Sequence, residues 1–106
     1  MTGWRIHPSA QEEHDAQIEA FAGIDEEFAI AFEERYLHYR HSICDNPLLF
    51  NLRRGLVRRV NLTPRFGEYY IAYMIWRENV VILAVAHGKR RPWYWRKRIG
   101  EAKRMF

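Results

Sequence analysis

Apolar residues in the first half of the chain recur with the spacing of α-helices. One stripe consists of Ala10, His14, Gln17, Ile18 and Phe21, and a second consists of Phe28, Phe32, Tyr36, Tyr39 and Ile43. Such stripes are typical of helices that bury one face. Pro8 suits a first helical turn, Gly23 a helix end, and Asp25 the cap of the next helix. The pattern predicts an antiparallel pair of helices over about residues 8–22 and 25–44.

Beyond residue 55 the pattern changes to the alternation of β-strands. In residues 56–62, Leu56, Arg58, Val60 and Leu62 alternate with Val57, Arg59 and Asn61, which predicts a strand. Residues 69–76 are rich in aromatic and β-branched side chains, which also predicts a strand. Residues 80–87 are almost wholly apolar, which favours a strand with a neighbour on each side. A tight hairpin connection is expected at 77–79, and a short alternation at 4–7 predicts one more strand.

These elements run in the order β-α-α-β-β-β, which predicts an α+β fold with a helical hairpin packed on an antiparallel sheet. The last three strands are expected to form a meander. In the last strand, strict alternation places Val81, Leu83 and Val85 on one side of the sheet and Ile82, Ala84 and Ala86 on the other. No linker or repeat divides the chain, so we treat residues 1–106 as a single domain.

Charge is unevenly distributed along the chain. Residues 1–34 hold one basic residue against nine acidic ones, while residues 35–106 hold sixteen against four, for a net charge of +4. This asymmetry favours a protein with one surface that meets a polyanion or an acidic protein segment. A set of solvated faces that happen to segregate is the alternative interpretation.

The composition bears on location as well. The longest apolar runs, residues 69–76 and 80–86, are shorter than the roughly 20 residues of a membrane-spanning helix. The N-terminus has no apolar stretch of the secretory type. Cys44 is the single cysteine, so no disulfide can form within the chain. We therefore expect a cytoplasmic protein without membrane contact.

Two stretches of the chain carry a family resemblance. The first is Ile6-His7-Pro8-Ser9-Ala10, followed by Glu12 and Glu13, at the expected strand-to-helix boundary. The second is the run from Val81 to Trp95 together with Arg98, which contains His-Gly-Lys-Arg-Arg-Pro-Trp-Tyr-Trp. Both resemble the RelE/ParE family of bacterial toxins, and more closely its ParE-like branch.

The middle of the chain is similar to the same family. Arg58-Arg59-Val60 and the aromatic strand ending at Tyr73 stand where the family has an arginine-bearing strand and its neighbour. The resemblance implies the RelE/ParE-like fold and a toxin of a type II toxin–antitoxin system, a class linked to growth inhibition and plasmid stabilization. It implies a cognate antitoxin as the partner, and a homo-oligomer within the antitoxin complex stays open.

The resemblance leaves two targets for the toxin. The ParE branch inhibits DNA gyrase without a known catalytic act of its own, and the RelE branch cleaves messenger RNA in the ribosome. The ParE-like ending favours a non-catalytic gyrase inhibitor, and a ribosome-dependent mRNA endoribonuclease is the alternative. A plain nucleic-acid-binding domain that uses the basic C-terminal end is the least favoured interpretation.

Each target predicts its own functional residues. Metal-free RNA cleavage needs a proton acceptor, a proton donor and cations for the phosphorane. Residues of these types are Arg58, Arg59, His87, Arg90 and Tyr94. Candidates for binding the antitoxin or the target are Arg59, Arg90, Arg91, Trp93, Trp95 and Arg98. An acidic antitoxin tail is expected across the sheet near Arg58, Arg59 and Arg90.

Other signals favour structural interpretations. The five histidines and Cys44 lack the spacing of metal ligands, and no glycine-rich phosphate loop is present, so we expect neither a metal nor a cofactor. His14 lies in the middle of an apolar stripe, which favours a histidine at the edge of the core with a hydrogen-bond partner. His87 equally fits a strand end, with the neighbouring arginines forming a solvated face.

Overall fold

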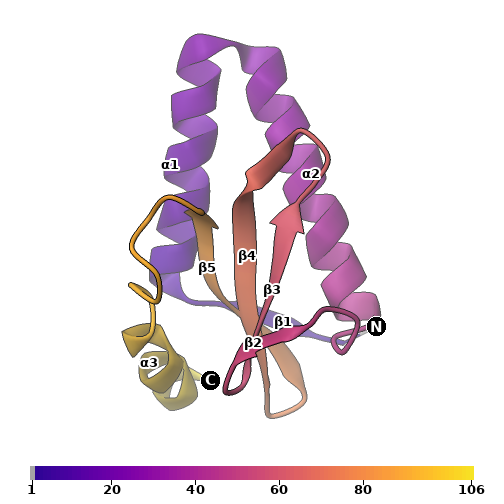
Figure 1. Ribbon diagram of the computed structural model, residues 1–106, viewed down its shortest axis with the longest axis vertical. Coiled ribbons are helices and arrows are strands. Elements are labelled where there is room, and N and C mark those ends of the chain that lie inside the picture. Colours follow the sequence, from indigo (N-terminus) through magenta and orange to yellow (C-terminus); the bar gives the residue numbers. More distant parts are fainter. Residues whose placement is uncertain (1) are drawn as a thin grey trace.

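The computed structural model describes residues 2–106, which form three helices and five strands (Figure 1). In chain order these are β1 (Trp4–Ile6), α1 (Pro8–Ile24), α2 (Glu26–Asp45), β2 (Leu52–Arg54), β3 (Val57–Leu62), β4 (Phe66–Trp76), β5 (Asn79–His87) and α3 (Lys97–Met105). The strands form one sheet in the order β1-β5-β4-β3-β2. The fold is therefore α+β, with the predicted meander of β3, β4 and β5 at its centre.

The helices α1 and α2 form the predicted antiparallel hairpin along the sheet (Figure 1). His7 caps α1, because its Nδ1 accepts a hydrogen bond from the Ser9 backbone N–H at 3.0 Å. Asp25 joins the two helices. Its backbone N–H donates to Phe21 O at 2.9 Å, and its Oδ1 accepts from the Glu27 N–H at 3.0 Å. Because Asp25 closes one helix and caps the next, α1 extends slightly beyond its predicted end.

Two hydrophobic layers lie on the two faces of the sheet. The layer under the hairpin is built from Phe32, Tyr36, Ile43, Leu62, Ile71, Tyr73 and Ile82, among others. The layer on the other face is covered by α3 and the segment that leads to it, and includes Val57, Tyr70, Met74, Val81, Leu83, Trp95 and Ala102. The sheet is thus enclosed between the helical hairpin and the C-terminal segment.

A β-bulge in β5 changes which side chains face the hairpin. Tyr73 pairs with Ile82 and Ala72 pairs with Ala84, so Leu83 is an extra residue in β5. Val80, Ile82 and Val85 lie in the hairpin-side layer, and Val81, Leu83, Ala84 and Ala86 lie in the other. The predicted alternation is correct through Leu83 and wrong for residues 84–86, because the bulge shifts it by one residue.

The sheet is mixed, and the prediction of a purely antiparallel sheet was wrong at one edge. β1 pairs with β5 in parallel, with Trp4 beside Val80 and Ile6 beside Ile82. The other neighbouring strands are antiparallel. The N-terminal strand can lie parallel to β5 because the helical hairpin and three strands separate the two in sequence.

The sequence patterns missed two elements. β2 has only three residues, all exposed, and so shows no apolar alternation. A turn at Gly55, whose φ of +54° is accessible mainly to glycine, leads from β2 into β3. α3 has a single fully buried residue, Ala102, in a segment dominated by basic side chains. The buried face of α3 is therefore too narrow to produce a recognisable apolar stripe in the sequence.

Acidic side chains gather at the tip of the helical hairpin, where Arg65 also lies, with its guanidinium carbon 4.7 Å from the Phe28 ring centroid. At the tip of the hairpin Ile24, Asp25, Glu26 and Glu27 are all exposed. This tip lies at the opposite end of the long axis from β2 and α3, which belong to the basic second half (Figure 1). None of the helices in residues 2–106 is long and apolar enough to cross a membrane.

Candidate anion-binding site

A pocket of about 320 Å³ opens on the sheet face opposite the helical hairpin. We call it the arginine pocket. It is lined by Arg53, Arg54, Val57, Arg59, Tyr70, Gly88, Arg90, Pro92, Trp93 and Trp95. The strands β2, β3 and β4 supply one side of this lining, and the segment after β5 supplies the other. The lining holds four arginines, three aromatic side chains and no carboxylate, a composition suited to an anion.

Three of the four pocket arginines lack acidic partners in the described part of the chain. Among residues 2–106, no carboxylate oxygen lies within 4.0 Å of the guanidinium groups of Arg53, Arg54 or Arg59. Arg90 has one distant partner, since its Nη1 lies 3.8 Å from Glu13 Oε2. The positive charge in the pocket is therefore largely unneutralised.

Arg59 is the most constrained of these groups. Its guanidinium carbon lies 3.8 Å from the ring centroid of Tyr70, in a cation–π arrangement. Its Nε is buried and has no hydrogen-bond partner among the described residues. Burial lowers the pKa of Arg59, and the nearby charge of Arg53 lowers it further. A bound anion would offset both penalties.

Two tryptophans form the wall of the pocket. Trp95 is buried, and its Nε1 donates a hydrogen bond to the Tyr70 hydroxyl at 3.0 Å. Trp93 is half-buried, with its ring centroid 4.8 Å from that of Trp95. The φ of Trp93 is +64°, a conformation that costs a non-glycine residue roughly 1–2 kcal/mol. Such strain is often found at functional sites.

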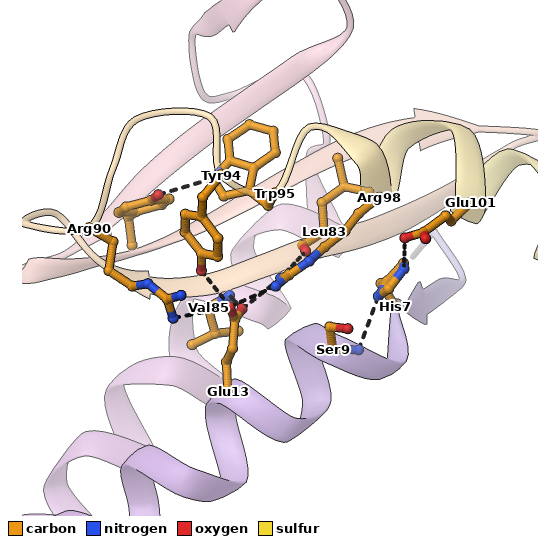
Figure 2. A network of polar contacts seen from close by, with 11 residues as sticks. His7, Ser9, Glu13, Leu83, Val85, Arg90, Tyr94, Trp95, Arg98 and Glu101 are labelled. Atoms are coloured by element: carbon orange, nitrogen blue, oxygen red, sulfur yellow. Dashed lines mark hydrogen bonds and ion pairs between the residues drawn. The ribbon is translucent and has the colours of Figure 1, made fainter.

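A shielded polar network ties the segment after β5 to α1 (Figure 2). Glu13 accepts two hydrogen bonds from the Arg98 guanidinium, at 2.8 Å and 2.9 Å, and one from the Tyr94 hydroxyl. The side chains of Glu13 and Arg98 are only 13% and 14% exposed. This network holds the segment that carries Trp93 and Trp95 against the sheet.

The same ion pair completes the sheet where β1 ends. β1 pairs with β5 only as far as Ile82. Beyond it, Leu83 O accepts a hydrogen bond from Arg98 Nη1 at 3.0 Å, and the Val85 N–H donates to Glu13 Oε1 at 3.1 Å. Two side chains therefore satisfy backbone groups that a longer β1 would otherwise have paired.

The network also fixes two proton positions. Burial raises the pKa of Tyr94, and its hydrogen bond to Glu13 raises that pKa further. The phenol therefore stays protonated near neutral pH and serves as a donor to Glu13. His7 accepts from the Ser9 N–H through Nδ1, so its Nε2 is the donor to Glu101 Oε1 at 2.9 Å. This second contact ties α3 to the start of α1.

The candidate nuclease residues do not meet at one point. Only Arg59 and Arg90 line the arginine pocket. The guanidinium of Arg58 donates to Phe50 O at 2.7 Å. Tyr94 does not line this pocket; its hydroxyl donates to Glu13, and the Arg90 guanidinium carbon lies 4.0 Å from its ring centroid.

His87 ends β5, as one interpretation of the sequence expected. Its Nε2 lies 3.0 Å from Glu68 Oε2, and its Nδ1 accepts from the Lys89 N–H at 3.0 Å. A neighbouring hollow of about 210 Å³ has both His87 and Arg59 in its lining, but it contains Glu68 and lacks Tyr94. The two predicted proton-transfer residues, His87 and Tyr94, are therefore not brought together in this hollow.

The candidate binding residues divide into two groups. Arg59, Arg90 and Trp93 line the arginine pocket, and Arg91 is exposed beside it. Trp95 and Arg98 are engaged inside the protein, through Tyr70 and Glu13 respectively. These last two residues support the pocket wall and offer little surface to a partner.

Sequence reasoning missed four residues of this region: Arg53, Arg54, Tyr70 and Glu13. Arg53 and Arg54 lie in the short strand β2, which no pattern indicated. Tyr70 was assigned only to the aromatic strand as a whole. Glu13 was noted only as part of a motif, although a carboxylate beside a long apolar stripe is a signal for a buried partner.

Two further expectations concern histidines and metals. His14 is buried, its Nδ1 lies 3.0 Å from Asp15 Oδ1, and its Nε2 lies 2.7 Å from Glu33 Oε2. The prediction of a partnered histidine at the core edge is confirmed, and its hydrogen bond lowers the pKa of Asp15. In the described part of the chain, no three His, Cys, Asp or Glu side chains are grouped to hold a metal.

Comparisons with known proteins match the chain to no family model and to no curated protein.

Proposed function

We propose that this protein is the toxin of a bacterial type II toxin–antitoxin system. It acts by binding DNA gyrase in the cytoplasm, and a cognate antitoxin neutralises it. The motif resemblance supports the family, and the α+β fold with a helical hairpin on a five-stranded sheet is compatible with a RelE/ParE-like arrangement. The arrangement of the functional groups supports binding over catalysis.

The observation that carries the proposal is the arginine pocket. Three arginines, Arg53, Arg54 and Arg59, have no acidic partner among residues 2–106 and surround a hollow on an accessible face. Unneutralised guanidinium groups beside a tryptophan are typical of interface hot spots. Carboxylates of an antitoxin segment or of the target would pair with these groups. Arg58 drops out of the expected contact, because its guanidinium is already bound to Phe50 O.

The endoribonuclease alternative has weaker support. It requires His87 and Tyr94 to serve as proton acceptor and donor on one phosphodiester. Tyr94 is bound to Glu13 and has a raised pKa, and His87 is paired with Glu68. Both side chains therefore have structural partners, and neither lines the arginine pocket.

The test combines an assay of the purified protein with an assay in induced cells. Purified wild-type protein is added to DNA gyrase in a supercoiling assay, and messenger RNA integrity is followed in bacterial cells after induction. The double variant Arg53→Glu/Arg59→Glu should lose inhibition by tens-fold or more, as expected for charged hot-spot residues. Arg5→Glu is the matched control, because Arg5 is exposed on β1 and its guanidinium donates a hydrogen bond to the Trp4 carbonyl.

Two outcomes would contradict the proposal. Cleaved messenger RNA together with unimpaired supercoiling would establish the endoribonuclease alternative. A protein that neither slows growth on induction nor inhibits gyrase would not be a toxin of this kind.

A further inference from the structure

We infer that the protein self-associates head to tail, with the tip of the helical hairpin of one copy docked on the opposite end of a second copy. The tip consists of residues 24–27, and the surface that receives it is a hollow between the turn at Gly55 and α3, which we call the α3 hollow. This inference goes beyond the proposed function, because it concerns the purified chain without an antitoxin or a target.

The α3 hollow has an apolar lining and a surplus of positive charge. Its volume is about 380 Å³, and Leu56, Trp93 and Ile99 supply its large apolar side chains. Its other lining residues are Arg54, Gly55, Arg96 and Lys103, so three cations and no carboxylate border it. The best-matched occupant therefore combines an apolar side chain with several acidic groups.

The cations of the α3 hollow have no acidic partner among residues 2–106, since no carboxylate oxygen lies within 4.0 Å of their charged groups. Two of them contact aromatic rings. The Arg54 guanidinium carbon lies 5.1 Å from the Trp93 ring centroid, and Lys103 Nζ lies 5.0 Å from that of Trp76. These contacts leave the positive charge unneutralised and available to a partner.

The hairpin tip has the complementary composition. Ile24 is 79% exposed, the largest exposed fraction among the large apolar side chains that the structure describes. Asp25, Glu26 and Glu27 follow it directly and are exposed, and no basic group in the described chain lies within 4.0 Å of their carboxylates. The tip therefore presents one apolar anchor beside three acidic groups.

One cation lies near the tip without cancelling its charge. The Arg65 guanidinium carbon lies 4.7 Å from the Phe28 ring centroid and 5.4 Å from that of Phe66. Arg65 therefore packs on two aromatic rings, and the three acidic side chains of residues 25–27 outnumber it.

The positions of the two surfaces require a second copy. They lie at opposite ends of the long axis, which measures 38 Å, so a copy cannot bring its own tip to its own hollow (Figure 1). A contact between two different surfaces leaves a free tip on one copy and a free hollow on the other. Such contacts propagate into an open chain or a ring and do not stop at a twofold dimer.

The experiment is sedimentation velocity of the purified full chain over a range of protein concentrations, at low and at high ionic strength. The tip variant is Ile24→Ser/Glu26→Gln, and the hollow variant is Arg96→Gln/Lys103→Gln. The matched control is Ile30→Ser/Glu34→Gln, which makes the same two substitutions at exposed positions further along α2. Thermal melts check that each variant is folded.

We expect the average mass of the wild type to rise with concentration beyond that of a dimer, and to fall when salt screens the charges. The tip variant and the hollow variant should each weaken self-association by tens-fold or more, as expected for interface hot spots, and the control should behave as the wild type. An equal mixture of the tip and hollow variants should form dimers and nothing larger, because such a pair keeps one intact tip and one intact hollow.

Three results would overturn the inference. The first is a wild type that stays monomeric at every concentration. The second is self-association that the tip variant or the hollow variant retains, which would place the interface elsewhere. The third is a mixture of the two variants that stays monomeric or forms assemblies as large as those of the wild type. These measurements use the purified chain alone, so gyrase inhibition is decided separately.

Discussion

Replacement of Glu13 by alanine tests the buried network most directly. In the wild type, Glu13 accepts hydrogen bonds from Arg98, from the Tyr94 hydroxyl and from the Val85 N–H. Glu13→Ala leaves the Arg98 guanidinium with Leu83 O as its one remaining partner at hydrogen-bond distance. The variant therefore creates a poorly compensated charge and two unpaired donors in a region that water reaches only in part.

The magnitude follows from the shielding of the pair. Breaking a buried ion pair by removing one partner costs about 3–5 kcal/mol. Both side chains keep a small exposed fraction, 13% for Glu13 and 14% for Arg98, so we expect the lower end of that range, about 3 kcal/mol. For a domain of this size, each kcal/mol lowers the melting temperature by roughly 4–8 °C, which gives a decrease of roughly 12–24 °C.

The assay is urea unfolding at neutral pH, followed by far-ultraviolet circular dichroism and by tryptophan fluorescence. Glu12→Ala is the matched control, because Glu12 is the preceding residue of α1 and is exposed. It should change the free energy of unfolding by less than about 0.5 kcal/mol. A Glu13→Ala variant within 1 kcal/mol of the wild type would refute the reasoning.

A double variant separates the charge from the edge contacts. Glu13→Leu/Arg98→Met removes both charges and should recover part of the lost stability. The recovery should be incomplete, since the Val85 N–H and the Leu83 carbonyl lose their partners and each unpaired group costs about 1–3 kcal/mol. Full recovery of the free energy of unfolding would mean that the hydrogen bonds of Glu13 and Arg98 to the edge of the sheet contribute nothing to stability.

Three further predictions concern pH, backbone and growth inhibition. Burial raises the pKa of Tyr73 from 10.0 to about 12, so its contribution to stability is complete below pH 10 and is lost as the pH rises toward 12; Tyr73→Phe should flatten that decline in urea titrations. Gly55→Ala should destabilise by about 1–2 kcal/mol because its φ is +54°, whereas Gly23→Ala, with open space in α1, should stabilise by about 0.5–1 kcal/mol; a loss of stability in the second would contradict this account. On induction in bacterial cells, His87→Ala should retain growth inhibition, because His87 lies outside the arginine pocket and loses only its contact with the exposed Glu68. Trp93→Ala should reduce growth inhibition, because Trp93 lines the pocket. A His87→Ala protein that folds but does not inhibit growth would point to catalysis instead.

The sequence was sufficient to predict the elements whose patterns are strong and local. The two helical stripes and the three long strands follow from burial of one face or of both, so their positions could be predicted to within a few residues. The bulge at Leu83 could not, because all residues around it are apolar and no polar position marks the change of phase. β2 was equally hidden, since an exposed three-residue strand depends on pairing with β3 and not on its own side chains.

The sequence indicated which residue types form the site, but it did not indicate toward which face of the sheet each side chain points. Arg58 and Arg59 are neighbours in sequence, yet they point to opposite faces of β3, and only Arg59 lines the arginine pocket. The resemblance indicated the C-terminal run as a whole, but it did not separate Trp93, which is partly exposed in the pocket, from Trp95, which lines the same pocket and is buried. The acidic partner of Arg98 lies 85 positions away in sequence, at Glu13, and only the fold brings the two together.

The separation of charge between the hairpin tip and the opposite end of the long axis gives the molecule a permanent electric dipole. A polyanion exerts a torque on such a molecule during diffusion, which turns the acidic tip outward and the basic end inward before contact. The first collisions are therefore already oriented, and a larger share of them become productive. Added salt screens this torque beyond about 10 Å at 0.1 M ionic strength, so the association rate constant should fall with salt much more steeply than the dissociation rate constant rises.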